Sequence, residues 1–224
     1  GKTYLVTANE GDARADWPGF NEETRVRAFC SAGLDPSVFA DAANQILDSN
    51  LGRLRITSTP NGGSTGKNAS GQCAELYSFG GRSFSIWDAS TVSRVYDSGD
   101  QMEQRTQALA NANFNASHDN NTLDGRSTAK GPEPEGVVLG SFGSKTFAFV
   151  GLERIGGVMV YDITNPAAAS FVTYLNTRSG LTGDRGPEGL ALIPAAKSPN
   201  GKPLLIVGNE ISGSTTVMQI NLGY

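Results

Sequence analysis

An internal repeat constrains the fold of this chain more than any other feature of its sequence. A lysine followed eight positions later by a glutamate, with mainly β-favouring residues between them, occurs three times: KTYLVTANE at 2–10, KTFAFVGLE at 145–153 and KPLLIVGNE at 202–210. Recurrence of one pattern at a fixed offset indicates a repeated structural unit. Each copy predicts a β-strand that ends near its glutamate, at Glu10, Glu153 or Glu210.

Further strands recur around these copies. Pro-Glu-Gly opens a short apolar strand at Glu135 and again at Glu188, 53 positions later. Strands that follow a glycine turn are predicted near 81–89, 156–163 and 213–220, and a fourth strand near 94–97 and 170–175. This order predicts an all-β fold, a β-propeller of about three four-stranded blades, one complete and two partial. A β-sandwich of similar strand density is the alternative.

Two segments do not follow the repeat. The stretch 11–74 is read as a long irregular insertion between strands, with a helix near 36–47, and the stretch 99–130 as a long inter-blade loop with a helical turn near 100–110. The whole chain, 1–224, is then part of one propeller domain. Because the two partial blades would leave sheet edges unpaired, we expect a partner to complete them, either missing N-terminal blades or another chain.

The amino-acid composition restricts the kinds of fold and partner that this chain can have. The 28 glycines and the 18% of charged residues suit short strands joined by tight turns, and the net charge of −4 argues against nucleic acid as a partner. No apolar run approaches the roughly 18 residues that span a bilayer.

Two cysteines, Cys30 and Cys73, stand 43 positions apart with no CxxC pattern and no nearby histidine. This spacing fits neither a zinc site nor a redox motif. A disulfide that closes the irregular segment is the first interpretation, and two unrelated buried thiols are the second. Three Asn-x-Ser/Thr triplets are candidates for glycosylation, at Asn68, Asn115 and Asn120.

Longer motifs carry a family resemblance. They are ANEGDAR at 8–14, ELYSFGGRSFSIWDA at 75–89, KGPEPEG at 130–136, FVGLERIGGVMVYDIT at 149–164 and SPNGKPLLIVGNEISG at 198–213. With these motifs the chain resembles the mesenchyme-specific cell-surface glycoproteins of biomineralising animals, whose bacterial relatives are called choice-of-anchor I proteins. The resemblance implies an exported propeller about twice as long, of which this chain would be the C-terminal half. It implies an extracellular, cell-surface or periplasmic location.

Repeated carboxylates suggest a cation site. If Pro-Glu-Gly opens each innermost strand, Glu135 and Glu188 lie near one mouth of the propeller channel, where Glu10, Asp12, Glu153 and Glu210 could join them. Calcium prefers such oxygen ligands, although another divalent metal would fit as well. The alternative is structural, with each glutamate accepting hydrogen bonds from backbone amides between blades.

Arginines beside these motifs support two interpretations. Arg14, Arg154 and Arg185 could pair with the glutamates, or could bind phosphate at an open mouth. His118 is the single histidine, in a polar loop, and we expect it to be solvated. A Ser-His-Asp triad within this chain is therefore close to excluded, and no catalytic residue can be assigned.

Two functions follow from these observations. The first is a secreted or cell-surface calcium-binding protein of the biomineralisation-associated type, with extracellular matrix or a mineral surface as partner. The second is a metal-dependent alkaline phosphatase or phytase-like phosphomonoesterase, because some relatives carry such labels. Whether the chain is an enzyme is left open.

Overall fold

The computed structural model describes residues 1–59 and 65–223, which form two compact units. The first, here called the sheet unit, comprises residues 1–10, 82–126 and 131–223. The second, the disulfide unit, comprises the described residues of 11–81 together with 127–130. Each is described by itself.

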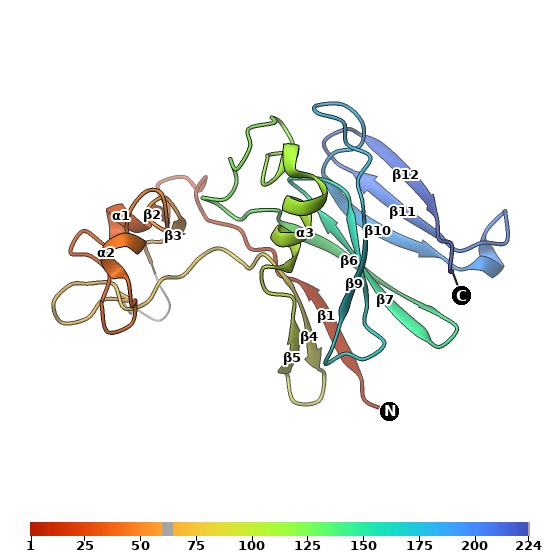
Figure 1. The fold of residues 1–224 in the computed structure, drawn as a ribbon, viewed down its shortest axis with the longest axis horizontal. Coiled ribbons are helices and arrows are strands. Elements are labelled where there is room, and N and C mark those ends of the chain that lie inside the picture. Colours follow the sequence, from red (N-terminus) through yellow and green to blue (C-terminus); the bar gives the residue numbers. More distant parts are fainter. Residues whose placement is uncertain (60–64, 224) are drawn as a thin grey trace. The chain divides into compact units, whose positions relative to one another are not determined.

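The sheet unit contains three antiparallel sheets whose strands follow one another in chain order (Figure 1). The complete four-stranded sheet is formed by β6 (Pro134–Phe142), β7 (Lys145–Leu152), β8 (Val158–Asp162) and β9 (Ser170–Leu175). A three-stranded sheet precedes it, with β1 (Tyr4–Ala8), β4 (Phe84–Asp88) and β5 (Ser93–Asp97). Another follows it, with β10 (Pro187–Ile193), β11 (Leu204–Asn209) and β12 (Ser214–Gln219).

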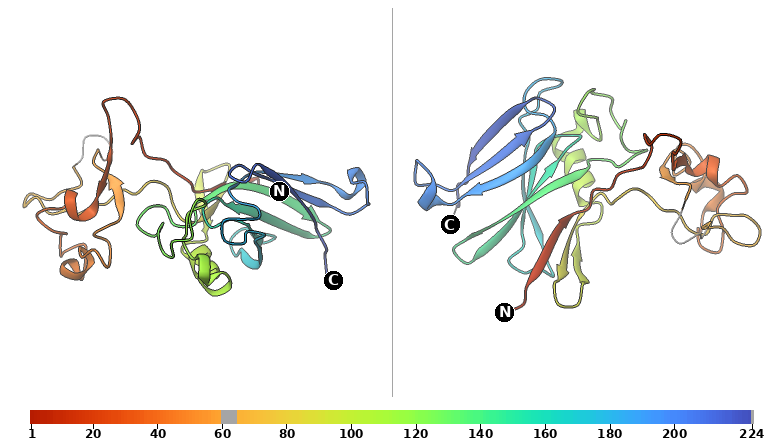
Figure 2. Two further views of the ribbon diagram at one scale, coloured as in Figure 1. Left: turned by 90° about the horizontal axis from the view of Figure 1, so that it is seen from above. Right: turned by 180° about the vertical axis from the view of Figure 1, so that it is seen from behind.

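These strands confirm the all-β prediction. The Lys-to-Glu repeats give β1, β7 and β11, the Pro-Glu-Gly segments give β6 and β10, and the post-glycine segments give β4, β8 and β12. Strand β10 packs beside β6 and β7, and β1 packs beside β6. Figure 2 shows β6 and β10 side by side in a second view of the unit.

The lysine that opens each repeat has a structural partner in two of the three sheets. Lys2 lies 3.2 Å from Asp88, and Lys145 lies 2.6 Å from Asp162, so the start of one strand is joined to the end of its neighbour. Hydrogen bonds from Ser90, followed by the one from Lys2, lower the pKa of Asp88 to about 2. The hydrogen bond from Lys145 is the main cause that lowers the pKa of Asp162 to about 2. The third sheet has Gln219 at the aspartate position, where it accepts a hydrogen bond from Asn200 instead.

The core of the sheet unit lies between neighbouring sheets. Phe84 of β4 and Tyr161 of β8 are both fully buried, and their ring centroids are 4.7 Å apart. Helix α3 (Gln101–Leu109) lies in the stretch 99–130, near the predicted helical turn, and buries Met102 in the same cluster. Two short 3-10 helices, Asn111–Asn113 and Ala195–Lys197, complete the unit.

The disulfide unit is small and irregular. It holds the two-stranded sheet of β2 (Glu23–Arg25) and β3 (Arg55–Thr57), with the one-turn helices α1 (Val26–Phe29) and α2 (Ala42–Gln45). Cys30 and Cys73 are joined in a disulfide, with Cα atoms 5.6 Å apart, which confirms the first interpretation of the cysteine pair. Both are fully buried in an apolar cluster with Val26, Leu34 and Ile56. Among the residues that the structure describes, no helix has the length and apolar character needed to span a bilayer.

Candidate functional site

The two Pro-Glu-Gly segments place their glutamates at β-bulges. The pairing of β6 with β7 shifts register between Pro134 and Val137, and the pairing of β10 with β11 shifts between Pro187 and Gly189. Glu135 and Glu188 lie within these irregular stretches. A bulge turns a side chain away from the regular alternation of a strand, and bulges are frequent next to functional sites.

A close backbone contact brings the two glutamates together. A Cβ atom at Gly136 would lie 2.2 Å from the backbone carbonyl oxygen of Glu188, which is a severe clash. Only glycine therefore permits β6 to approach β10 at this point. The glycine of Pro-Glu-Gly thus sets the spacing between the innermost strands, next to Glu135.

Four glutamates of the sheet unit interact electrostatically, and together they are called here the glutamate cluster: Glu10, Glu135, Glu188 and Glu210. Burial raises the pKa of Glu135, and the negative charges of the other three members raise it further. A hydrogen bond with Glu210, followed by the charge of Glu210, raises the pKa of Glu188. Like charges that are held near each other favour the protonated form.

One oxygen of the glutamate cluster is unusual. Oε2 of Glu135 is buried and has no hydrogen-bond partner among the described residues, whereas Glu10, Glu188 and Glu210 are exposed. A buried carboxylate oxygen without a partner is costly, and it fits a cation better than an apolar neighbour. Within the same described residues, however, no three acidic, histidine or cysteine side chains are close enough to hold a metal ion by themselves.

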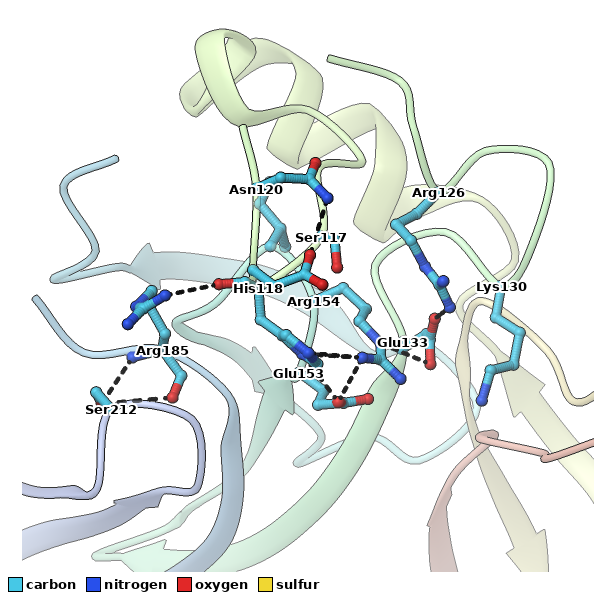
Figure 3. A network of polar contacts seen from close by, with 12 residues as sticks. Ser117, His118, Asn120, Arg126, Lys130, Glu133, Glu153, Arg154, Arg185 and Ser212 are labelled. Atoms are coloured by element: carbon cyan, nitrogen blue, oxygen red, sulfur yellow. Dashed lines mark hydrogen bonds and ion pairs between the residues drawn. The ribbon is translucent and has the colours of Figure 1, made fainter. Parts of the chain in front are cut away.

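Glu153 has a different environment, although its position in the repeat matches that of Glu210. Its Oε1 lies 3.1 Å from Nη1 of Arg154 and 3.2 Å from Nδ1 of His118 (Figure 3). Nε of Arg154 lies 3.1 Å from Oε2 of Glu133, which is also paired with Arg126. We call these five residues the arginine–glutamate network.

Glu133 is the most constrained member of this network. Its side chain is completely buried, and its backbone has a φ of +53°. The left-handed region costs a residue with a side chain about 1–2 kcal/mol, and such strain is frequent at functional sites. Glu133 was not among the predicted site residues, because the Pro-Glu-Gly pattern selects the second glutamate of KGPEPEG, Glu135.

The expectation that His118 is solvated is wrong. Its side chain is only 14% exposed and contacts Arg154, with Nη1 of that arginine 2.9 Å from Nδ1. Burial, followed by the positive charge of Arg154, lowers the pKa of His118. The neutral imidazole is therefore favoured at neutral pH. No local sequence signal could show this, because the contact joins residues 36 positions apart.

The arginines considered for phosphate binding are engaged by other groups of the protein. Arg14, in the disulfide unit, donates two side-chain hydrogen bonds to Glu22, each 2.9 Å, and lies over the rings of Trp17 and Phe20. Arg185 donates to the backbone carbonyl of His118 at 3.0 Å. With Arg154 held in the arginine–glutamate network, this arrangement does not favour the phosphomonoesterase alternative.

Asp12 belongs to a different unit from the glutamate cluster. It lies in the disulfide unit, where its carboxylate is 3.9 Å from Nζ of Lys130.

Arg178, which was not among the predicted site residues, is 8% exposed and has a structural role. Its guanidinium donates to the backbone carbonyls of Ser117, Asn120, Arg154, Ile155 and Gly180.

The three glycosylation candidates differ in accessibility. Asn115 is fully buried and donates a 2.6 Å hydrogen bond from Nδ2 to Glu103. Nδ2 of Asn68 donates to Asp35 and to Gln72. Asn120 is exposed, and its Nδ2 contacts only the neighbouring Asp119 among the described hydrogen bonds.

Comparison with known proteins identifies the family. The sequence model of the choice-of-anchor I domain family matches residues 1–166. The chain belongs to the choice-of-anchor I family. Gigasin-3a of Magallana gigas is 29% identical over 77% of this chain and 66% of its own length. The mesenchyme-specific cell surface glycoprotein of Strongylocentrotus purpuratus is 25% identical over 73% of this chain and 24% of its own length. No solved structure matches the chain significantly.

The chain covers only part of the length of each of these two relatives. The chain spans slightly less than two thirds of the first relative and about a quarter of the second. The activities and partners of whole family members are therefore proposals for this chain.

Proposed function

We propose that this chain is part of a secreted or cell-surface β-propeller whose glutamate cluster binds calcium. The propeller is supported by three sheets that repeat one strand order, with β6 and β10 adjacent as innermost strands. Propeller blades are four-stranded sheets repeated around a central channel. In this arrangement the bulged glutamates of Pro-Glu-Gly face one end of that channel.

The observation that carries the calcium proposal is the environment of Glu135. Its buried Oε2 has no hydrogen-bond partner among the described residues, and burial, followed by the charges of Glu188, Glu10 and Glu210, raises its pKa. A divalent cation would offset the repulsion among these carboxylates, which the charge of Arg154 already opposes at Glu135. Calcium takes six to eight oxygens and accepts water and backbone carbonyls among them, so it does not require a complete cage of carboxylates.

Two observations support a location outside the cytoplasm. The Cys30–Cys73 disulfide is typical of exported proteins. One relative is named a mesenchyme-specific cell surface glycoprotein. We therefore extend the proposal to an extracellular binding role, with matrix components or a mineral surface as the partners of the calcium-loaded domain.

A calorimetric titration of the chain with calcium tests the proposed function. We expect saturable binding that Glu188→Gln and Glu210→Gln each weaken about tenfold or more, because each removes one carboxylate of the glutamate cluster. Asp16→Asn is the matched control, since it removes an exposed carboxylate of the disulfide unit. No saturable binding by the wild type, or equal weakening by all three variants, would refute the calcium site.

A further inference from the structure

An apolar cavity lies between the sheet β6–β9 and the sheet β10–β12. Its volume is about 430 Å³, and its lining includes Phe147, Phe149, Val172, Leu175, Met218 and Ile220. Val172 and Leu175, both on β9, are 48% and 45% exposed. Apolar surface of this kind is normally covered by another part of a protein.

The equivalent space between the sheet β1–β4–β5 and the sheet β6–β9 is filled, and it shows which element can cover such a surface. There Phe171 of β9 packs against the buried core that contains Phe84 and Tyr161. The rings of Phe171 and Tyr161 are in edge contact, with centroids 5.9 Å apart. The strand β9 is thus the element that fills the space between the first two sheets with an aromatic side chain.

The repeat relates Tyr161 to Met218. Tyr161 is paired with Ala148 of β7, and Met218 is paired with Leu205 of β11, 57 positions later in each strand. Met218 lines the cavity, as Tyr161 lines the filled interface. A residue equivalent to Phe171 would therefore lie opposite Met218.

The edge of β12 provides the backbone for such a strand. In the part of the chain that the structure describes, β12 pairs with β11 alone, whereas β8 pairs with both β7 and β9. The pairing of β8 with β9 shifts register between Val160 and Tyr161, and that of β4 with β5 shifts at the equivalent pair Ile86 and Trp87. The fourth strands β5 and β9 thus pair with their neighbours with the same register shift.

We propose that the edge of β12 and the apolar cavity form an acceptor site for an additional antiparallel β-strand. The partner is an extended polypeptide segment that resembles β9, with a large apolar or aromatic residue opposite Met218. Strand addition uses main-chain hydrogen bonds for affinity and side-chain pockets for specificity. The proposal rests on sheet geometry and is independent of calcium binding.

A peptide with the sequence of residues 168–177, which contains β9, is the probe. We expect the fluorescently labelled peptide to bind the wild-type chain saturably, as measured by anisotropy. In the chain, Met218→Asp should weaken binding at least tenfold. Val217→Asp, on the opposite face of β12 where Val217 is 59% exposed, should change it less than about twofold.

The peptide carrying Phe171→Asp gives a test that does not depend on the folding of a variant protein, and it should also bind at least tenfold more weakly. Absence of saturable binding, or equal binding of the two peptides, would overturn the proposal. So would sedimentation showing that the chain self-associates through Met218 and that the peptide does not compete, because a second copy would then occupy the site.

Discussion

Glu133 and Gly186 occupy equivalent positions in successive repeats. Each precedes the proline that opens an innermost strand, and each has a positive φ, 53° and 70°. Each also accepts a backbone hydrogen bond from the glutamate that follows the next strand, at 2.9 Å from Glu153 and at 2.8 Å from Glu210. A glutamate thus stands where the fold favours glycine, and the arginine–glutamate network compensates for the strain.

This relationship predicts an unusual order of stability among variants. Glu133→Gln, Glu133→Ala and Glu133→Gly should each lower the free energy of unfolding by about 3–5 kcal/mol, because Arg126 and Arg154 lose a buried partner. Glu133→Gly should nevertheless be about 1 kcal/mol more stable than Glu133→Ala, since glycine adopts the positive φ without strain. Urea denaturation measures both differences.

Glu103 in α3 provides the matched control. It is an ion-paired glutamate in a helix, where alanine is about 1 kcal/mol more favourable than glycine. Alanine should therefore be the more stable replacement at Glu103. The same order at both positions would show that the backbone of Glu133 is not strained.

Stability in calcium-free buffer should depend on pH through the glutamate cluster. The pKa values of Glu135 and Glu188 are raised, so both groups bind a proton more tightly in the folded state than in the unfolded chain. Their favourable contribution is present at low pH and is lost as the pH rises through their folded pKa values. The melting temperature should then fall as the pH rises above about 4.5, the ordinary pKa of a glutamate.

Other carboxylates act in the opposite direction over a different range. The pKa values of Glu22, Asp88 and Asp162 are lowered to about 2, so their stabilising contribution is lost only as the pH falls from about 4.5 toward 2.

Two variants test the contribution of the glutamate cluster at higher pH. Glu188→Gln should flatten the decrease of the melting temperature with pH above pH 5, and Asp16→Asn should leave that decrease unchanged. An unchanged slope in Glu188→Gln would contradict the coupling.

The disulfide should stabilise the disulfide unit. Closing a loop of 43 residues limits the freedom of the unfolded chain by about 3–4 kcal/mol in the chain-entropy description. In the Cys30→Ala/Cys73→Ala variant, amide hydrogen exchange should accelerate across residues 11–59 and 65–81. Exchange in β6–β9 serves as the internal control and should change little. Equal acceleration in both regions would argue against a local role.

Glycosylation in a eukaryotic secretory host should discriminate among the three triplets. Mass spectrometry should find a glycan at Asn120, which is exposed, and none at the fully buried Asn115. Asn115→Gln should lower stability by about 1–3 kcal/mol through its lost buried hydrogen bond, whereas Asn120→Gln should be nearly neutral. A glycan at Asn115 of the folded, secreted protein would contradict the buried environment described here.

Much of the sheet unit was predictable because its information is local and repeated. The alternation of apolar residues, the glycine turns and the lysine offset give the strands, and Lys2–Asp88 and Lys145–Asp162 explain the offset physically. The closing of the sheets into a propeller stays a prediction.

The site was only partly predictable. Glu135, Glu188, Glu210 and Glu10 could be proposed from their repeat positions, and the structure places their charges within interaction range. The distinct environment of Glu153 depends on His118 and Arg154, and that of Glu133 on Arg126. Such contacts arise from loops without a repeat, so periodicity carries no information about them. Comparing Glu133 with Gly186 was the one sequence signal that could have revealed the strained glutamate.

Thermal melting in calcium and in chelator tests the central claim most directly. Binding to the folded state should stabilise the wild-type chain by about 2.7 kcal/mol at a hundredfold excess of calcium over its Kd. Glu135→Gln and Glu188→Gln should lose about half of this gain or more, and both should melt at or above the wild-type temperature in chelator, because each relieves repulsion in the glutamate cluster. If instead the wild type melts at one temperature in both buffers, and the two variants are destabilised equally with and without calcium, the glutamates serve only as hydrogen-bond acceptors and the calcium site is refuted.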